Sequence, residues 1–290
     1  MKVPVALGIL SLLGCHAGPA CSEWIADAET GFVHDGNLSH GQLRQDIKGD
    51  TALEVAASAG QRLVLGDYSG LSLTGNLKSA AYNRYHGLNH LDLGMALAFK
   101  TKLGLGPAAP WWRATGSATR LKYQNDLRDG WLYTVGSAVG KRVGESWNVR
   151  GDFVYERRTA DQNIGVAPGI SGAVFDQRSH SIQANADYAY SEAIAISAGY
   201  TRRVGDVVAT TQRNYEIFEY STAVASDPVF GSDTFAYKLR AVTHVFFIGA
   251  SRALNAHSSL NLGFERQISH GTGDNNYYSS VVRLALAYSF

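Results

Sequence analysis

Histidine, serine and aspartate lie close together at two points of the chain, and such groups can supply the nucleophile and the base of a hydrolase. His180 stands between Ser179 and Ser181, and His90 comes two residues before Asp92. Successive side chains of an extended segment point to opposite faces, so His180 cannot share a face with either neighbouring serine. His90 and Asp92 do share a face, but no serine accompanies them locally. Neither group predicts a catalytic site.

Other kinds of chemistry leave no pattern in the sequence. There is no metal-ligand spacing, no phosphate-binding glycine loop and no cysteine–histidine pair, so we expect neither a metal nor a cofactor. The net charge is +1 and no basic run occurs, which argues against nucleic acid as a partner. A serine, a histidine and an aspartate on different strands can still converge, so an enzyme stays open as the less favoured alternative.

Charged side chains instead recur on one side of an alternating pattern. WNVRGDFVYER, from Trp147, alternates large apolar residues with polar ones. This period of two predicts a β-strand with one apolar face and one polar face. Charged residues are only 18% of the chain, against roughly 25% in soluble domains. Runs of about 10 such residues have the length that a tilted strand needs to cross a bilayer.

About twelve such runs occur, and the connections between them alternate in length. Short turns fall near 66–67, 104–110, 144–145, 191–192 and 255–256. The other connections include the long polar segments 36–50, 159–177 and 207–233. The predicted strands are 24–35, 51–61, 69–83, 89–102, 110–124, 130–142, 146–158, 178–190, 193–206, 234–251, 257–269 and 277–290.

The first residues differ from the rest. MKVPVALGILSLLG has one lysine followed by a short apolar run, which predicts a secretory signal peptide over residues 1–22 and a mature domain over 23–290. The favoured cleavage follows Ser22; a lipobox-like alternative places a lipid on Cys15. Late cleavage removes both cysteines, so the mature chain then has no disulfide.

The chain ends in VVRLALAYSF, an alternating apolar strand whose last residue is Phe290. This ending resembles the C-terminal signal of bacterial outer-membrane β-barrel proteins, a porin-like superfamily. Only these ten residues are motif-like, although the strand pattern spans about residues 24–290. The resemblance implies a closed all-β transmembrane antiparallel up-and-down barrel of about 12 strands in the outer membrane of a Gram-negative bacterium. It also implies that Phe290 ends a strand recognised by the barrel-assembly machinery, and that both termini are periplasmic.

The polar face of the strands would line the lumen of such a barrel. Charges of both signs at similar depth fit either a narrow water-filled pore or ion pairs across a closed interior. Twelve strands lie between the filled 8-stranded barrel and the open 16-stranded porin, and this size favours the pore. The predicted pore-lining residues are Lys78, Lys100, Arg113, Arg150, Asp152, Glu156, Asp187, Lys238, Arg240, His244, Glu265 and Arg283.

The predicted function is passive passage of small hydrophilic solutes, with anionic or saccharide-like compounds as candidates. The alternatives are a lipid-modifying hydrolase and a non-conducting surface or assembly-support barrel. Arg157, Arg202 and Arg266 fall on the lipid side near the outer rim, where either contacts with lipopolysaccharide phosphates or plain solvation would satisfy them. The 207–233 segment could constrict the pore or extend its flanking strands as a hairpin, and the strand-like composition of NYEIFEYS favours the hairpin.

Overall fold

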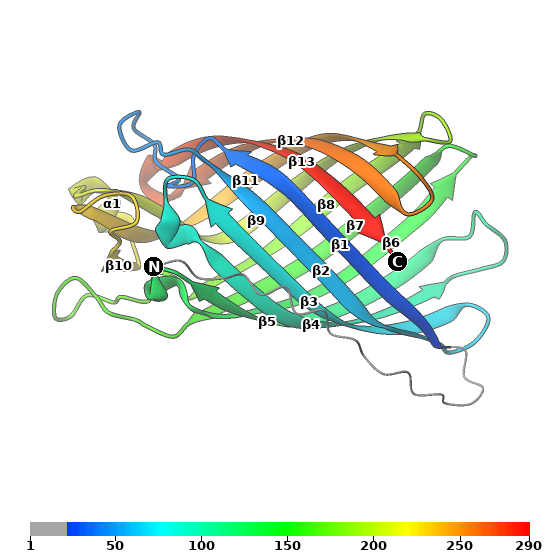
Figure 1. Ribbon diagram of the computed structural model, residues 1–290. Helices are drawn as coiled ribbons and strands as arrows, with labels where there is room; N and C mark the ends of the chain where they lie inside the picture. The colour runs from blue at the N-terminus through cyan, green and yellow to red at the C-terminus, as the bar shows by residue number, and fades with distance from the viewer. Residues whose placement is uncertain (1–21) are drawn as a thin grey trace, which may run out of the picture.

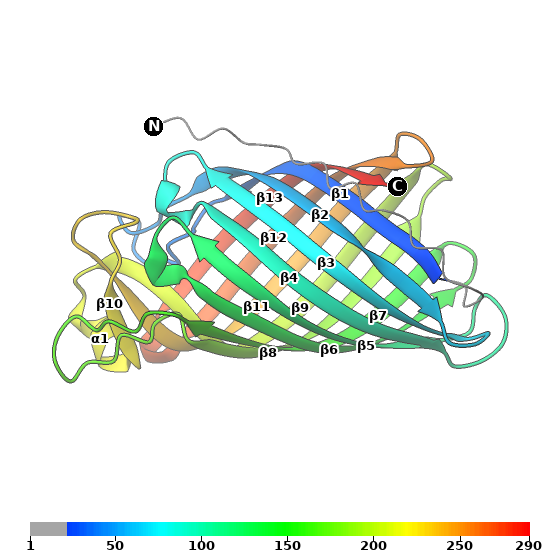
Figure 2. The same cartoon turned by 60° about the horizontal axis from the view of Figure 1, so that its bottom comes forward.

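The computed structural model describes residues 22–290, and these residues form one closed antiparallel β-barrel of 12 strands (Figures 1 and 2). Ten strands are 13 to 15 residues long, and β9 and β11 are longer. The barrel strands are β1 (Ser22–Asp35), β2 (Asp50–Val64), β3 (Ser69–Tyr82), β4 (His90–Lys102), β5 (Trp111–Tyr123), β6 (Gly130–Val143), β7 (Trp147–Ala160), β8 (Gln177–Ala189), β9 (Ile194–Gln212), β11 (Thr234–Ala253), β12 (Ser258–Gly271) and β13 (Asn276–Ser289).

The predicted strands match these elements closely, and the predicted signal peptide lies almost entirely outside the described residues. Each barrel strand pairs with its neighbours in the chain, apart from the inserted β10 (Ala223–Ser226). The last strand closes the barrel against the first: Asp27 lies opposite Ser289, and the Phe290 N–H donates to the Ala26 carbonyl at 3.0 Å. The apolar C-terminal strand is therefore a wall strand paired on both sides, as predicted.

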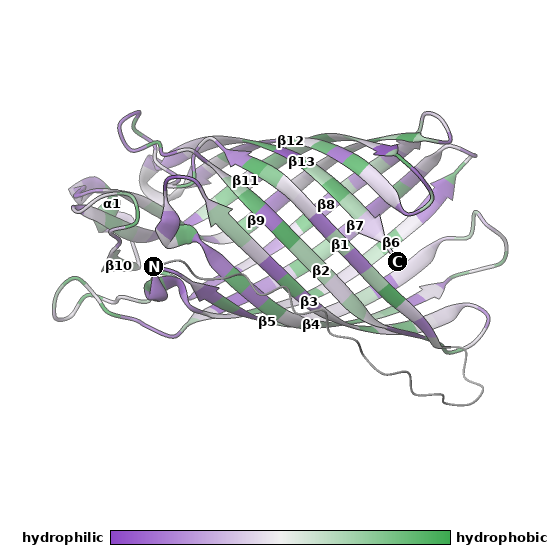
Figure 3. Cartoon of the chain, viewed as in Figure 1, coloured by the Kyte–Doolittle hydropathy of each residue, from purple (hydrophilic) through white to green (hydrophobic). Residues whose placement is uncertain are grey.

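The outward face of the barrel is apolar and the inward face is polar (Figure 3). On β4, Leu93 and Met95 are about three-fifths exposed, at 62% and 60%. Asp92 precedes Leu93, and Gly94 lies between Leu93 and Met95; both face inward, where Asp92 is partly buried and Gly94 is buried. So many exposed leucine, valine and aromatic side chains on one surface would be unfavourable in water, and this surface matches the lipid-facing band of a membrane barrel. No helix within residues 22–290 has the length and apolar character needed to cross a membrane.

The two ends of the barrel differ. Tight turns join the strands at one end, and Ser22 and Phe290 both lie at that end (Figure 1). The other end carries the longer connections 36–49, 161–176 and 213–233. It also carries three 3-10 helices: η1 (His86–Leu88), η2 (Asp126–Arg128) and η3 (Thr272–Asp274).

The strands β9 and β11 continue beyond the barrel wall as a two-stranded hairpin. β8 pairs with β9 only as far as Gly205, whereas β9 and β11 stay paired to Gln212 and Thr234. Both faces of this extension are buried. One face packs Val207, Ala209, Tyr237 and Leu239 with Tyr277 of β13; the other packs Val208 and Ala236 with Leu127, Val174 and Phe175.

The segment between these two strands contains a helix where the sequence suggested strand. The preference for a hairpin was right, but α1 (Tyr215–Tyr220) occupies NYEIFEYS. The Asn214 side chain accepts hydrogen bonds from the N–H groups of Glu216 and Ile217, which caps the helix. Ile217 is then buried against the hairpin, so capping and packing outweigh the β-propensity of the aromatic residues.

The 36–49 loop crosses from β1 to the free edge of β9. The Thr210 N–H donates to the Ser39 carbonyl at 2.8 Å, and the His40 ring bonds to the Val208 carbonyl at 2.9 Å. His40 also stacks on Tyr277 with 4.4 Å between ring centroids. Because β1 and β9 are not neighbours in the barrel, this contact carries the loop across the loop end of the lumen.

Candidate lumenal site

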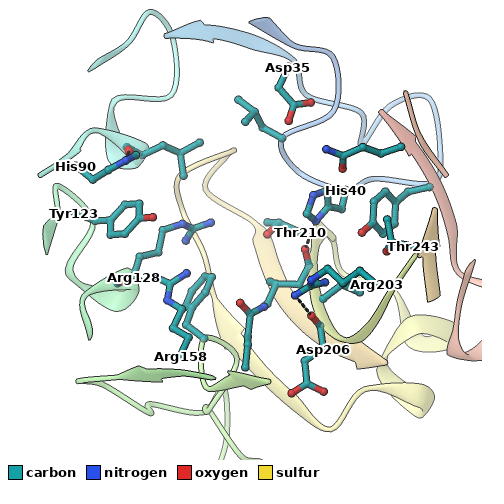
Figure 4. Close-up of a pocket in the computed structure, with 18 of the residues that line it drawn as sticks. Asp35, His40, His90, Tyr123, Arg128, Arg158, Arg203, Asp206, Thr210 and Thr243 are labelled. Atoms are coloured by element: carbon teal, nitrogen blue, oxygen red, sulfur yellow. Dashed lines mark hydrogen bonds between the residues drawn. The ribbon is translucent and has the colours of Figure 1, made fainter. Parts of the chain in front are cut away.

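A cavity of about 450 Å³ lies in the lumen behind the docked loop (Figure 4). Side chains from widely separated strands face it, together with the loop and the base of the hairpin. The labelled residues in the figure are Asp35, His40, His90, Tyr123, Arg128, Arg158, Arg203, Asp206, Thr210 and Thr243. Three of these are arginines, and they differ in whether an acid neutralises their charge.

Arg128 is a structural cation. Its two terminal nitrogens donate to both carboxylate oxygens of Asp227 at 3.0 and 2.8 Å, and Thr210 donates to the same carboxylate at 3.0 Å. Asp227 is fully buried and Arg128 nearly so. The pair joins η2 to the segment after β10, so its charge is already neutralised.

Arg158 and Arg203 differ from Arg128, because no carboxylate oxygen within residues 22–290 lies within 4.0 Å of either guanidinium. The Arg158 Nη2 donates to the Arg128 carbonyl at 2.5 Å, and its Nε has no partner in the described structure. Its guanidinium lies over Tyr123 and Phe175, at 5.4 and 5.2 Å from the ring centroids. The cavity therefore contains a positive charge held by aromatic rings rather than by an acid.

Arg203 lies on β9 just before the strand leaves the wall. Its Nε donates to the Ser179 hydroxyl at 3.1 Å, and its Nη2 donates to the Asp206 backbone carbonyl at 3.1 Å. These neutral acceptors fix the direction of the guanidinium without cancelling its charge. Arg203 was not among the predicted pore-lining residues. The alternation in the predicted strand 193–206 puts Arg202 on the lipid side, and the same alternation puts Arg203 on the lumenal side.

The candidate catalytic groups do not form a nucleophile–base pair in the described residues. The His90 Nε2 is 3.7 Å from Asp92, and its Nδ1 bonds to the Leu88 carbonyl at 2.8 Å. His180 points outward while Ser179 and Ser181 are buried on the inward face. Within residues 22–290, no cluster of three or more histidine, cysteine or acidic side chains could hold a metal.

Two ion-pair groups lie on opposite parts of the lumen wall. On β1 to β3 and β13, Glu54 is 2.9 Å from Lys78 and 3.5 Å from Arg283, which also lies 3.9 Å from Glu29. Lys78 and Arg283 are among the predicted pore-lining residues, whereas Glu29, which shares their face, is not.

The second group centres on Asp152. Arg150 lies 2.8 Å from this carboxylate and Arg113 lies 3.9 Å away. Asn185 donates to the same carboxylate at 3.3 Å. The remaining predicted lumenal side chains on the wall also face inward: Lys100 lies over the Trp111 ring, Glu156 accepts from Ser179, Asp187 accepts from Ser197, and Glu265 stands opposite Phe247.

The predicted inward face of β11 was wrong for three residues. His244 points outward, where its ring bonds to the Tyr200 hydroxyl at 2.7 Å beside exposed Phe246. Arg240 is exposed on the same face, and Lys238 lies on the hairpin beside Asp206 at 3.7 Å. The alternation on β11 was predicted correctly, but the inward and outward faces were exchanged. Tyr237 and Leu239, which were expected to face lipid, are buried inside the protein at the loop end of the barrel.

Comparisons with known proteins support the architecture. No protein-family model matches the chain, and no curated protein matches it in sequence. An outer-membrane channel from Pseudomonas putida F1 has a similar structure, with a TM-score of 0.64 and 15% identity over 94% of this chain and 97% of that one. The NanC porin gives 0.48 and 9% identity over 91% and 98%, respectively, and the translocator domain of the autotransporter NalP from Neisseria meningitidis gives 0.43 and 13% over 95% and 90%.

At these identities the likeness concerns the fold, and only the first comparison is close enough to support an argument. The fold is that of bacterial outer-membrane β-barrels, which agrees with the lipid-facing band and with the C-terminal strand. The chain therefore has the fold of a porin-like outer-membrane β-barrel.

Proposed function

We propose that the protein is a passive channel for small hydrophilic anions, and that the cavity behind the docked loop is its selective segment. The observation that carries this proposal is the pair Arg158 and Arg203, which face the cavity without a carboxylate partner. Unpaired guanidinium groups near low-dielectric walls attract anions and repel cations. The flanking Tyr123 and Phe175 provide ring faces that suit planar or saccharide-like solutes.

The proposal assumes an orientation in which both termini are periplasmic and the long loops face the outside. In this orientation a solute would meet the cavity before it reaches the ion pairs around Glu54 and Asp152. The C-terminal strand that ends at Phe290 would be the segment bound by the barrel-assembly machinery. Protease accessibility of the 161–176 loop in intact cells tests this orientation.

Single-channel recording of the refolded protein in a planar bilayer tests the function. We expect stepwise openings with an anion preference, and loss of most of that preference in the double variant Arg158→Gln/Arg203→Gln. The matched control is Arg266→Gln, because Arg266 is outward-facing and exposed. A cation-selective wild type, or an equal change in the control, would contradict the proposal.

A second candidate function is a non-conducting surface barrel. The observation in its favour is the 36–49 loop, which crosses the lumen to β9. A correctly folded wild type that stays silent, together with stepwise openings in a variant lacking residues 38–47, would support this alternative over an open channel.

A further inference from the structure

A polar hollow of about 310 Å³ lies on the outward face of the barrel, at the loop ends of β7 and β8. The hairpin side chain Lys238 and the 161–176 loop complete it. Arg157 and Arg178 line it together with Tyr155. Arg158 lines both this hollow and the lumenal cavity. We call Arg157, Arg178 and Lys238 the rim site.

The two arginines of the rim site are direct cross-strand partners: Arg157 of β7 stands opposite Arg178 of β8. Side chains in this relation have β-carbons about 5 Å apart, and like charges placed so are destabilising. Within the described chain, no carboxylate oxygen lies within 4.0 Å of either guanidinium. The repulsion between them is thus not relieved by an ion pair of the protein.

Two acids lie at the rim site, and neither forms an ion pair with either arginine. Asp176 lines the hollow, and Asp206 pairs with Lys238. One oxygen of Asp176 accepts the Ala160 N–H at 2.6 Å. Asp206 accepts the Arg178 backbone N–H at 3.0 Å and lies 3.7 Å from Lys238. Two cations that line the hollow therefore remain available to a ligand.

Another sector of the same rim is built differently. On β5, outward-facing Arg120 is paired with Asp161, and Lys122 is paired with Asp129. Unpaired positive charge is thus not a general property of the loop ends. Between β7 and the hairpin, by contrast, the three basic residues of the rim site line one hollow, and exposed Arg240 lies on the same face as Lys238.

We propose that the rim site binds a phosphate group of an outer-leaflet glycolipid of the lipid A type. A phosphate oxygen pair fits the fork of an arginine, and two facing arginines can hold one doubly charged group. Exposed Ile182 and Phe153 lie nearer the middle of the same two strands and provide an apolar surface for acyl chains. This lipid would sit outside the lumen, at the loop end that the proposed function places outside the cell. A test at Arg157 and Arg178 leaves Arg158, which lines both spaces, unchanged.

Native mass spectrometry of the refolded protein in nanodiscs titrated with lipid A tests the site. We expect the double variant Arg157→Gln/Arg178→Gln to bind lipid A about tenfold or more weakly, as lost charge-assisted contacts would cause. The matched control Arg120→Gln removes an outward arginine of the same rim whose charge Asp161 already neutralises, and it should bind as wild type does. Heat-modifiable mobility on gels confirms that each variant is folded.

Two further probes identify the ligand chemistry. Lipid A stripped of its phosphates should bind the wild type as weakly as intact lipid A binds the double variant. Phosphatidylglycerol should bind more weakly than lipid A and should discriminate little between the variants. Equal binding of lipid A by wild type and double variant, or equal binding of phosphatidylglycerol and lipid A by the wild type, would overturn the proposal.

Discussion

The first and second parts of β9, residues 194–204 and 205–211, lie in two different environments. From Ile194 to Val204 its side chains alternate between lipid and lumen, and partly exposed residues occur on both faces. From Gly205 to Thr211 nearly every side chain is buried, because β10, α1 and the 161–176 loop cover the two faces of the hairpin. The wall is therefore a membrane barrel, whereas the loop end around the hairpin, here called the mouth, is packed like the interior of a water-soluble protein.

The polar contacts of the two parts follow the same division. In the wall, the Lys78–Glu54 pair leaves the lysine 38% exposed and the glutamate 16% exposed. In the mouth, Arg128 and Asp227 are 7% and 0% exposed. Solvent screening makes exposed pairs weak, whereas removing one partner of a buried pair leaves a costly unpaired charge. The same kind of substitution should therefore have very different effects in the two parts.

The largest effect is expected from Asp227→Ala, which leaves Arg128 buried without its carboxylate. We expect the hairpin and the segment 213–233 to lose about 3–5 kcal/mol of docking free energy, while the barrel wall stays folded. Hydrogen exchange of the amides at 206–212 and 234–239 measures this loss. Wild-type protection of these amides in the variant would contradict the claim that buried ion pairs stabilise the mouth more than exposed pairs stabilise the wall.

The control for that experiment is Arg120→Ala, which breaks an exposed pair with Asp161. Its expected effect is about 1 kcal/mol or less, because both side chains are solvated. A large loss of hairpin protection in this variant would mean that rim charges act on the mouth in a way that burial does not explain.

A smaller effect is expected from Gly205→Ala, at the point where β9 leaves β8. A β-carbon there would lie 2.4 Å from the Arg178 carbonyl oxygen and from the Ser179 β-carbon, so the backbone has to shift. We expect a cost of about 1–3 kcal/mol, measured as faster proteolysis of the 213–233 segment. Gly116→Ala is the matched control, because nothing lies within 4 Å of its β-carbon position. Equal proteolysis of the two variants would show that the close approach at Gly205 does not set the bend.

The smallest effect is expected from the protonation of His40. Burial lowers the pKa of His40 below its usual value near 6.5, against the opposing effects of its bond to the Val208 carbonyl and of nearby Asp35. Arg203 lowers this pKa further. The docked loop therefore favours the neutral ring: docking is fully stable above about pH 6.5 and weakens as the pH falls below that value.

Hydrogen exchange of the 37–48 amides between pH 7.5 and pH 5 measures this change, after correction for the intrinsic exchange rate. We expect protection to fall on acidification in the wild type and to stay level in His40→Gln, whose side chain does not titrate. A wild-type loop whose protection rises as the pH falls would show that docking favours the charged ring instead.

Much of the barrel was predictable because lipid and water impose a strict alternation on each wall strand. The run from Trp147 placed Arg150, Asp152 and Glu156 on one face, and all three side chains point inward. On β11 the same rule assigned the two faces the wrong way round: His244 was predicted to face inward, and it points outward. Alternation fixes which residues share a face, but it cannot say which face meets lipid once both faces become apolar.

The number of strands and their order could be read from the sequence, because they follow from local periodicity and turn composition. The closing pair of β13 with β1 was expected from the resemblance of the C-terminal strand to those of outer-membrane barrels. Tertiary structure alone decided that β9 leaves β8 at Gly205, that the 36–49 loop reaches Val208 and Thr210, and which arginines remain without an acid. Those contacts join residues far apart in the chain, among them Arg128 with Asp227 and His40 with Tyr277. Their free energy depends on burial and distance, which no local pattern encodes.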